Sequence, residues 1–337
     1  MTHRQSTVVI CGATAGVGRA SAHAFARAGY RVALIARGAD GLADTSAELQ
    51  AFGTQVLAIS ADVADAEAID RAADQVEAEL GPIEVWVNSA MATVFSPVEK
   101  ITAAEYKRVT DVTYLGFVHG TLAALRHMRP RDRGTIVQVG SALSYRAIPL
   151  QSAYCAAKFA IRGFTDSLRC ELIHSKSRIR LTMVQLPAHN TPQFDWSRNK
   201  MPRRPQPVPP LHTPEVAARA IMRAVKEAPR ELWVGRASLQ AILGNMFMPG
   251  LLDRMMAKQA WSGQMAEEPA NPEEPDNLFE PVEGLHRLEG RFDHQIQDRA
   301  VALSSETVGK LAVAGLAAVT VGAVALVASI ASGRSRR

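Results

Sequence analysis

Three side chains in the middle of the chain have the types and spacing needed for proton transfer to a carbonyl oxygen. Tyr154 and Lys158 are four residues apart, so they share one face of a helix. A lysine ammonium near a phenol stabilises the phenolate and lowers the tyrosine pKa, which suits a general acid or base near neutral pH. The hydroxyl of Ser141, expected at the end of the preceding strand, can polarise the same oxygen. We therefore predict these three residues to be catalytic.

A glycine-rich turn near the N-terminus has the form of a phosphate-binding loop. Residues 8–11 are an apolar run, and a helical pattern begins at residue 20. Glycines between a strand and a helix allow the backbone to approach a pyrophosphate closely, and the helix N-terminus adds unpaired N–H groups. We expect the cofactor contacts of this turn to come from Gly12, Thr14, Gly16, Val17 and Gly18.

The ends of the next two apolar runs bear on which cofactor is bound. The run 31–36 ends at Arg37, where an acidic residue would bind a ribose 2′-hydroxyl and repel a 2′-phosphate. An arginine there can pair with the phosphate, which favours NADPH over NADH, although a plain surface arginine is the alternative. Asp62 and Val63 follow the third run and are expected at the adenine ring, or Asp62 caps a helix.

These residues depend on an alternation of apolar strands and amphipathic helices. Six apolar runs are expected as buried strands, with 231–235 as a possible seventh, and helical patterns separate the early ones. Strands that are apolar throughout indicate a parallel sheet covered on both faces, with ligands at the carboxyl ends of the strands. The predicted fold class is α/β, a doubly wound parallel, Rossmann-like sheet. The six runs are 8–11, 31–36, 55–61, 85–88, 135–140 and 180–186.

Composition excludes several classes of protein. The chain has 337 residues, of which 47% are hydrophobic, so a large core is expected and global disorder is not. Its three cysteines form no CxxC pair, and neither histidines nor carboxylates have metal-ligand spacing, so we expect no metal. His119, His174 and His189 are expected to be structural or surface residues. No aromatic-rich basic motif accompanies the net charge of +5, so we expect no nucleic-acid partner.

Composition also divides the chain into a catalytic domain and the segments that follow it. Residues 1–261 are expected to form one catalytic domain whose loop 192–212, rich in proline, acts as a substrate loop or lid. Apolar residues at helical spacing in 237–261 favour core packing, with a membrane- or substrate-facing surface as the alternative. Residues 262–306 contain eleven acidic residues and three arginines and are expected as a linker.

Residues 307–337 contain the longest uncharged stretch of the chain, 311–331. Its 21 residues would span about 30 Å as a helix, which is the thickness of a bilayer core. We expect a transmembrane helix, with a buried core helix or an oligomerisation helix as alternatives. The arginines after it favour a cytoplasmic C-terminus, whereas the absence of a signal peptide favours a cytoplasmic catalytic domain. We expect a membrane-associated protein with its catalytic domain in the cytoplasm and leave the orientation of the helix open.

The motifs together resemble those of the short-chain dehydrogenase/reductase family in its ordinary, non-extended form. The resemblance covers residues 7–235 and implies reversible hydride transfer between a nicotinamide and an alcohol/carbonyl pair, usually in a homo-oligomer. On that resemblance Tyr154 is the proton donor, Ser141 positions the carbonyl oxygen and Lys158 holds the nicotinamide ribose. The resemblance adds cofactor contacts from Asn88, Ala90, Tyr154, Lys158, Pro187 and Thr191.

One position departs from the family pattern. Thr113 stands where the family commonly has an asparagine that holds a water of the proton relay. A threonine hydroxyl can also hold a water, so Thr113 is a fourth catalytic candidate. We expect an NADP-dependent oxidoreductase that acts on an apolar substrate. The alternatives are a non-catalytic NADPH sensor or scaffold at a membrane, and a soluble enzyme whose tail packs in an oligomer.

Overall fold

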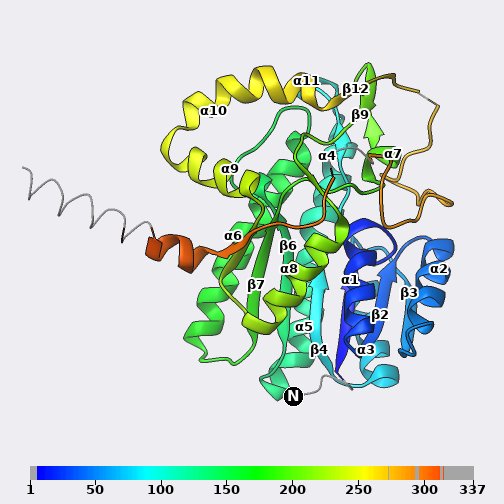
Figure 1. The fold of residues 1–337 in the computed structure, drawn as a ribbon. Coiled ribbons are helices and arrows are strands. Elements are labelled where there is room, and N and C mark those ends of the chain that lie inside the picture. The colour runs from blue at the N-terminus through cyan, green and yellow to red at the C-terminus, as the bar shows by residue number, and fades with distance from the viewer. Residues whose placement is uncertain (1–5, 272, 293–295, 312–313, 315–337) are drawn as a thin grey trace, which may run out of the picture.

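In the computed structural model, which describes residues 6–271, 273–292, 296–311 and 314, an eight-stranded sheet lies between two layers of helices (Figure 1). The strand order is β14-β11-β7-β6-β4-β1-β2-β3, and every neighbouring pair is parallel except β11 and β14. The strands are β1 (Thr7–Cys11), β2 (Arg31–Ala36), β3 (Val56–Ser60), β4 (Ile83–Asn88), β6 (Thr135–Ser141), β7 (Arg180–Leu186), β11 (Glu231–Val234) and β14 (Ala302–Ser304).

The helices divide between the two faces of the sheet. One face is covered by α1 (Gly16–Arg27), α2 (Ala39–Gln50) and α8 (Pro214–Glu227). The other is covered by α3 (Ala66–Leu80), α4 (Ala103–Thr110), α5 (Gly116–Met128) and α6 (Ser152–His174). Successive side chains of a strand point to opposite faces. In β1, Val9 packs with one layer while Val8 and Ile10 pack with the other. The predicted doubly wound α/β fold is confirmed.

Smaller elements surround the carboxyl ends of the strands. Three two-stranded pairs lie there: β5 (Val94–Phe95) with β8 (Arg198–Asn199), β9 (Arg203–Pro205) with β12 (Met265–Pro269), and β10 (Leu211–His212) with β13 (Ile296–Gln297). The short helix α7 (Gln193–Trp196) precedes β8. After β11 come α9 (Arg236–Phe247), α10 (Pro249–Met255), the π-turn η5 (Met256–Ala260) and α11 (Trp261–Gly263).

The acidic segment expected as a linker packs against the domain. Its strands β12, β13 and β14 pair with β9, β10 and β11, and Leu278 is fully buried in the main core. The composition suggested little apolar surface, yet the few apolar residues of the segment are placed where they are buried. The described residues of 262–306 are therefore part of the folded domain rather than a free linker.

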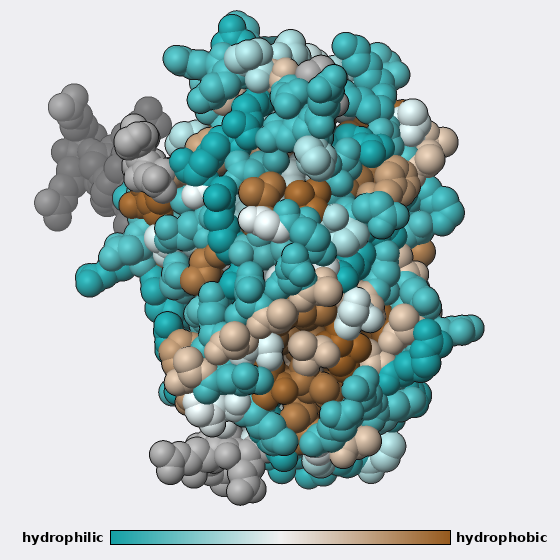
Figure 2. Space-filling view, turned by 90° about the vertical axis from the view of Figure 1, so that its right-hand side faces the viewer, coloured by the Kyte–Doolittle hydropathy of each residue, from teal (hydrophilic) through white to brown (hydrophobic). Residues whose placement is uncertain are grey.

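The two edges of the sheet differ. On one side β14 pairs antiparallel with β11 and covers its outer edge. On the other side β3 is the terminal strand, with partly exposed Val56, Leu57 and Ile59. This edge faces the viewer in Figure 2, where apolar side chains gather in the lower half of the surface. Among the described residues no helix is both long and apolar enough to cross a bilayer. Apart from Leu311 and Ala314, the predicted membrane segment 311–331 lies outside those residues.

Candidate active site

The register of the central strands brings the predicted residues to one edge of the sheet. Cys11 of β1 pairs with Asn88 of β4, and Asn88 pairs with Gln138 of β6. Because the strands are parallel, the glycine turn after β1, the residues after β4 and Ser141 at the end of β6 all emerge on the same side. The cofactor motif and the catalytic motif are therefore neighbours, although more than one hundred residues separate them.

The glycine turn has a backbone shape that side chains would prevent. Gly12 has φ of +81°, and a Cβ there would meet the Ala90 backbone at 2.6 Å. A Cβ on Gly18 would lie 1.8 Å from the Gly12 carbonyl oxygen. Helix α1 begins at Gly16, and its N-cap Ala15 has no side chain that could cap the first amides. The first amides of α1 thus lack a side-chain cap, and the Gly16 amide donates to the Arg287 carbonyl at 3.0 Å.

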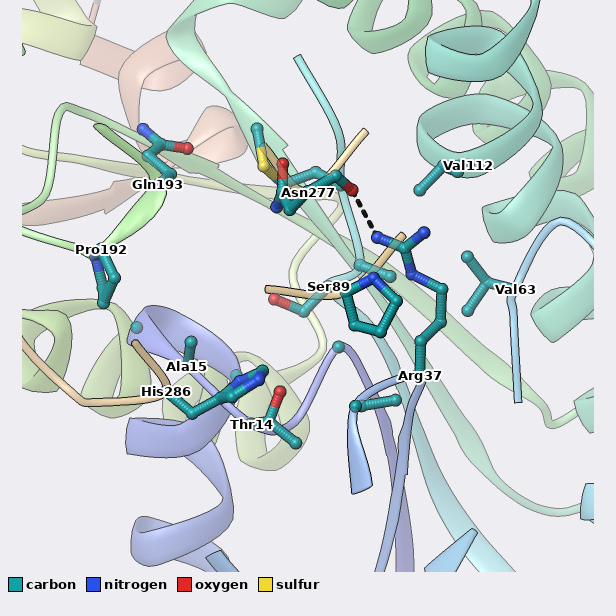
Figure 3. A pocket seen from close by; sticks show the side chains of 18 of the residues that line it. Thr14, Ala15, Arg37, Val63, Ser89, Val112, Pro192, Gln193, Asn277 and His286 are labelled. Atoms are coloured by element: carbon teal, nitrogen blue, oxygen red, sulfur yellow. Dashed lines mark hydrogen bonds between the residues drawn. The ribbon is translucent and has the colours of Figure 1, made fainter. Parts of the chain in front are cut away.

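A cavity of about 200 Å³ lies above this turn (Figure 3). Ten of the predicted cofactor residues line it: Gly12, Thr14, Gly16, Val17, Gly18, Arg37, Asp62, Val63, Ala90 and Thr191. Other lining residues were not predicted, including Ala15, Ser89, Pro192, Gln193, Trp196, Asn277, Pro281, Val282 and His286. The last four come from the acidic segment, and no local sequence signal connects that segment with a nucleotide site.

Four predicted cofactor residues, Asn88, Tyr154, Lys158 and Pro187, do not line the cavity. The Asn88 side chain is buried in a hydrogen-bond network inside the sheet. Its Nδ2 donates to Gln138 Oε1 at 2.9 Å, and its Oδ1 accepts from Trp86 Nε1 at 2.8 Å. Asn88 thereby fixes the spacing of β4 and β6 beneath the site, and the exposed part of the β4 exit is formed by the residues that follow it.

The three catalytic candidates are together at the end of β6 and the start of α6. Lys158 is buried, and its Nζ lies 5.5 Å from the centroid of the Tyr154 ring and donates to the Val139 carbonyl at 2.8 Å. The Ser141 hydroxyl forms a hydrogen bond with the Tyr154 phenol. The predicted spacing of Tyr154 and Lys158 on one helix face is thus realised, and both groups face the end of β6.

The electrostatics of the pair differ from the expectation. Burial raises the pKa of Tyr154 above its ordinary value, and the hydrogen bond from Ser141 opposes this only in part. Burial also lowers the pKa of Lys158 to about 7. The prediction that Lys158 lowers the tyrosine pKa is wrong for the protein alone, because desolvation disfavours the ammonium that would do so. Tyr154 therefore stays protonated near neutral pH, while Lys158 is about half protonated there.

Thr113 does not have a free hydroxyl. It lies in a π-helical turn, η2 (Asp111–Leu115), between α4 and α5. Its Oγ1 donates to the Ala92 carbonyl and accepts from the Ala92 amide, both at 2.9 Å. Since a hydroxyl has a single proton, Thr113 has none left to donate to a relay water. We interpret Thr113 as a positioning residue that braces the segment after β4.

Arg37 and Asp62 line the cavity beyond the ends of β2 and β3 and already have partners. Arg37 donates to the backbone carbonyls of Asn277 and Phe279, at 2.5 and 2.7 Å. Asp62 accepts from the Ala64 amide at 2.9 Å and pairs with Arg108 at 2.6 Å. Each side chain is therefore held in a fixed position at the rim.

His189 is a structural residue, as expected. Its Nδ1 contacts the Pro187 carbonyl at 2.9 Å, and burial lowers the pKa of the imidazole to about 4. No group of three or more histidine, cysteine, aspartate or glutamate side chains that could hold a metal exists in the described part of the chain.

A dinucleotide cradle on a doubly wound sheet, with serine, tyrosine and lysine beside it, defines a nucleotide-binding oxidoreductase. Residues 6–202 match the family model described as short chain dehydrogenase, which is more than half of the chain, and the protein belongs to that family. The chain is 32% identical over 286 residues to an uncharacterized oxidoreductase of Bacillus subtilis, YxnA. That match covers 84% of this chain and 80% of the relative.

Solved structures agree with this assignment. A short-chain dehydrogenase from Streptomyces avermitilis has a TM-score of 0.63 and 28% identity, over 76% of this chain and 95% of that one. An alcohol dehydrogenase of the archaeon Thermococcus sibiricus, complexed with 5-hydroxy-NADP, has a TM-score of 0.58 and 27% identity, over 68% and 95%. The protein is an oxidoreductase that acts on an alcohol/carbonyl pair.

Proposed function

We propose that the protein is an NADPH-dependent reductase or dehydrogenase of apolar alcohols and carbonyls. The single observation that carries the cofactor half is Arg37, which stands at the end of β2 and lines the cavity where an acid would exclude a 2′-phosphate. The Thermococcus sibiricus relative complexed with 5-hydroxy-NADP supports the same choice.

The residues of the cradle fit a dinucleotide. The cavity beside the turn is lined by Gly12, Gly16 and Gly18, and the absence of side chains at Gly12 and Gly18 lets the backbone of the turn pack closely around it. The turn and the start of α1 would hold the pyrophosphate, and Lys158 would hold the nicotinamide ribose. A bound nicotinamide supplies a hydride to the carbonyl carbon or accepts one from the alcohol carbon.

The chain itself handles the proton of the reaction. The Tyr154 phenol donates its proton to the carbonyl oxygen in reduction and takes it back in oxidation. Ser141, already hydrogen-bonded to this phenol, donates to the same oxygen and fixes its position. Burial keeps Tyr154 protonated before substrate binds, which suits the acid role. Ribose hydroxyls that accept hydrogen bonds from Lys158 would favour its ammonium form. That ammonium would stabilise the Tyr154 phenolate left after proton transfer.

Three further features belong to this proposal. We propose a membrane-associated protein whose catalytic domain is in the cytoplasm, anchored by residues 311–331. We also propose a homo-oligomer, since Leu122 of α5 and Phe159 and Ile173 of α6 are exposed apolar residues on one layer of the sheet. Size-exclusion chromatography with light scattering in mild detergent tests the oligomer, and a monomeric mass would refute it.

The enzymatic proposal is tested by steady-state kinetics with hydrophobic ketones, aldehydes and secondary alcohols. NADPH is expected to give a higher kcat/KM than NADH, and Arg37→Asp is expected to remove that preference. Arg37→Asp with an unchanged preference would refute the cofactor assignment. Turnover of small polar substrates in preference to apolar ones would refute the substrate class.

A further inference from the structure

Helices α9 and α10 and the turn after them carry an apolar surface that the rest of the described chain does not cover. They form the upper part of Figure 1. Phe247 is 78% exposed, and its neighbours on both helices are also exposed. We call this set the hairpin surface, and it consists of Met246, Phe247, Met248, Leu251, Met255 and Trp261.

The outer side of an ordinary amphipathic helix is polar, whereas the outer side of α9 and α10 carries these apolar residues. Helix α9 does bury an apolar stripe, since Ile242 packs with Tyr145 and Trp233. Its C-terminal end and α10 then present large apolar side chains to the outside as well. Contiguous exposed apolar surface on a soluble domain marks an interaction site for a protein, a ligand or a membrane.

The position of the C-terminal tail points to the membrane. Residues 305–311 are helical, and Val308 packs against the cluster of Tyr145, Trp233 and Ile242 that holds α9. The uncharged stretch 311–331 therefore begins beside the base of α9. If that stretch enters a bilayer, the hairpin surface is held close to the same bilayer.

Charge and geometry agree with this placement. Exposed Arg254 and Lys258 lie one helical turn apart next to the apolar residues, where they can meet anionic headgroups. The exposed acid of α10, Asp253, pairs with Arg146 at 2.7 Å and so is neutralised. An apolar face with basic residues beside it is the pattern of a helix that lies in the membrane interface.

The hairpin also contacts the loop that follows Ser141. Asn245 Nδ2 of α9 donates to the Tyr145 carbonyl at 2.9 Å, and Gln264, which follows α11, donates from Nε2 to the Pro149 carbonyl at 2.9 Å. We propose that the hairpin surface inserts into the interfacial layer of a lipid bilayer and so places residues 142–151 at the membrane. An apolar substrate would then reach the site from the lipid. This last step rests on the proposed enzymatic activity, and the choice of a bilayer rests on the proposed membrane segment 311–331.

Trp261 provides an internal probe for the docking. It is 44% exposed, whereas Trp86, Trp196 and Trp233 are buried. The full chain is reconstituted in vesicles of phosphatidylcholine and phosphatidylglycerol that contain phosphatidylcholine brominated at shallow or deep acyl positions. We expect quenching of Trp261, stronger with shallow bromines, and loss of that quenching in Trp261→Phe.

Two variants separate insertion from simple proximity. The combined change Phe247→Ser, Met248→Ser and Leu251→Ser is expected to reduce the quenching at least twofold while the chain stays in the vesicle fraction. The matched control Ile173→Ser removes an exposed apolar residue from α6 and is expected to change nothing.

Three results would overturn the docking proposal. The first is no Trp261 quenching with an unshifted emission, which would mean that the surface stays in water. The second is a blue-shifted Trp261 emission without quenching, which would mean that the tail or a second copy covers the surface. The third is equal quenching in the triple variant and the wild type. The quenching needs no turnover, so an inactive protein that shows it would refute the proposed function and leave the docking in place.

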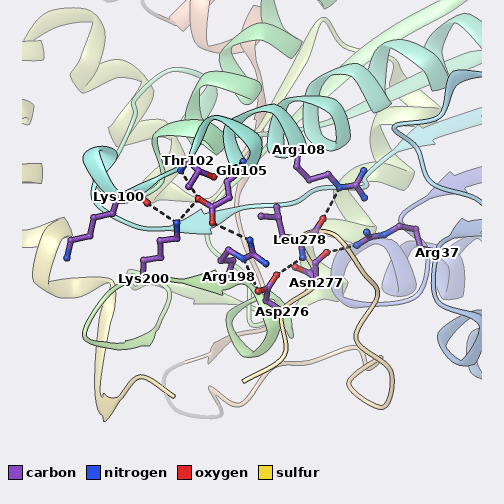
Figure 4. Close-up of polar contacts among 10 residues, drawn as sticks. All are labelled: Arg37, Lys100, Thr102, Glu105, Arg108, Arg198, Lys200, Asp276, Asn277 and Leu278. Atoms are coloured by element: carbon purple, nitrogen blue, oxygen red, sulfur yellow. Dashed lines mark hydrogen bonds and ion pairs between the residues drawn. The ribbon is translucent and has the colours of Figure 1, made fainter. Parts of the chain in front are cut away.

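A second inference rests on a different set of contacts. Residues 276–291, here called the strap, cross the mouth of the nucleotide cavity. The Gly16 amide at the start of α1 donates to the Arg287 carbonyl at 3.0 Å, and Arg19 donates to the His286 carbonyl at 2.6 Å. At the other end of the cavity, the strap carbonyls of Asn277 and Phe279 accept hydrogen bonds from the two terminal nitrogens of Arg37. The bond to Asn277 is drawn in Figures 3 and 4.

These donors are the ones that a phosphorylated dinucleotide needs. A helix N-terminal amide and an arginine after β2 are the usual partners of phosphate oxygens, and here strap carbonyl oxygens take their place. The remaining cavity of about 200 Å³ is smaller than the 300–1,000 Å³ typical of ligand pockets. Phosphate oxygens can therefore reach the Gly16 amide and the Arg37 guanidinium only if these strap carbonyls move away.

The strap is anchored at several points outside the cavity. Leu278 is fully buried in the main core, and Arg108 Nε donates to its carbonyl at 2.8 Å. Asp276 pairs with Arg198 at 2.8 Å (Figure 4). At the other end Arg287 pairs with the buried Asp195 at 2.7 Å. We propose that the strap competes with the cofactor phosphates for Arg37 and Gly16, and that NADPH binding releases it.

Hydrogen exchange on the full chain tests this inference, which rests on the proposed cofactor. With NADPH bound, as judged by its fluorescence, peptides from 276–291 are expected to exchange several-fold faster. Slower or unchanged exchange would overturn the competition. In that case the strap is a fixed wall, while NADPH binding still supports the proposed function.

A variant gives an independent measure. Leu278→Ser removes the apolar anchor of the strap and is expected to lower the Kd for NADPH several-fold. Val301→Ser, an exposed apolar change outside the strap, is the matched control and is expected to leave the Kd unchanged. An equal or higher Kd in Leu278→Ser would contradict the proposal.

Discussion

Lys158 is expected to lower the stability of the native state near neutral pH. Its ammonium is buried with one hydrogen bond, to the Val139 carbonyl, and burial lowers its pKa from 10.5 to about 7. A base whose pKa is lower in the native state than in the unfolded chain destabilises the native state at pH values below its unfolded pKa, and the penalty is complete below its native pKa. That penalty disappears as the pH rises from about 7 toward 10.5. Lys158→Met should therefore stabilise the protein near neutral pH while it abolishes turnover.

The magnitude follows from the pKa values. Each pH unit in that window corresponds to about 1.4 kcal/mol, so the full penalty at low pH is about 5 kcal/mol, of which about 4 kcal/mol applies at pH 7. Loss of the donor to the Val139 carbonyl offsets about 1–3 kcal/mol of the gain. A net stabilisation of about 1–3 kcal/mol at pH 7 remains, which for a domain of this size raises Tm by several degrees, at about 2–4 °C per kcal/mol.

The assay is urea unfolding of the wild-type protein and of Lys158→Met at pH 7, 8 and 9. The difference in unfolding free energy between Lys158→Met and wild type should narrow by about 1.4 kcal/mol per pH unit, because only the wild type gains stability. A variant that is less stable at pH 7, with a difference that does not change with pH, would refute the reasoning. Tyr154→Phe is the control, since it keeps Lys158 in place.

Four further outcomes are expected. Tyr154→Phe should lower kcat about 10²–10⁴-fold with an unchanged Kd for NADPH, measured by fluorescence titration, and a retained kcat would exclude the phenol as the acid. Arg37→Asp should raise the KM for NADPH at least tenfold and leave that for NADH unchanged or lower, as steady-state kinetics would show. Gly18→Ala should abolish cofactor binding because its Cβ would lie 1.8 Å from a backbone oxygen, and calorimetry showing normal affinity would contradict this. Iodoacetamide at pH 7.5 should modify exposed Cys170 alone, since burial raises the pKa of Cys11 to about 12 and that of Cys155 to about 11, and mass spectrometry would reveal any second adduct.

The sheet was predictable because its signals are local. Each central strand is an apolar run of five to seven residues, so a parallel sheet buried on both faces follows from the runs themselves. Eight of the ten cofactor residues that line the cavity were predictable for the same reason, since a glycine turn or a strand end marks each segment, whereas Ala90 and Thr191 came from the family resemblance. Asn88 shows the limit of this approach, because a residue at a strand end can face the core or the ligand and only the packing decides.

The electrostatics of the site were not predictable from spacing. The four-residue interval placed Tyr154 and Lys158 on one face, and the structure keeps them there. Whether each group is charged depends on how much water reaches it, which is set by Phe117, Val139 and the surrounding layers rather than by the motif. The same holds for Thr113, whose hydroxyl is taken by a residue 21 positions earlier in the chain.

The sequence by itself determined the order of strands and helices, the glycine turn and the types of the reacting groups, since these depend on side-chain chemistry and near neighbours. Only the tertiary structure decided that the acidic segment folds back over the nucleotide cavity and that the apolar ends of α9 and α10 stay uncovered. Arg37 meets Asn277 across 240 residues, and contacts of that separation arise from the packing of the whole domain, for which local composition carries no signal.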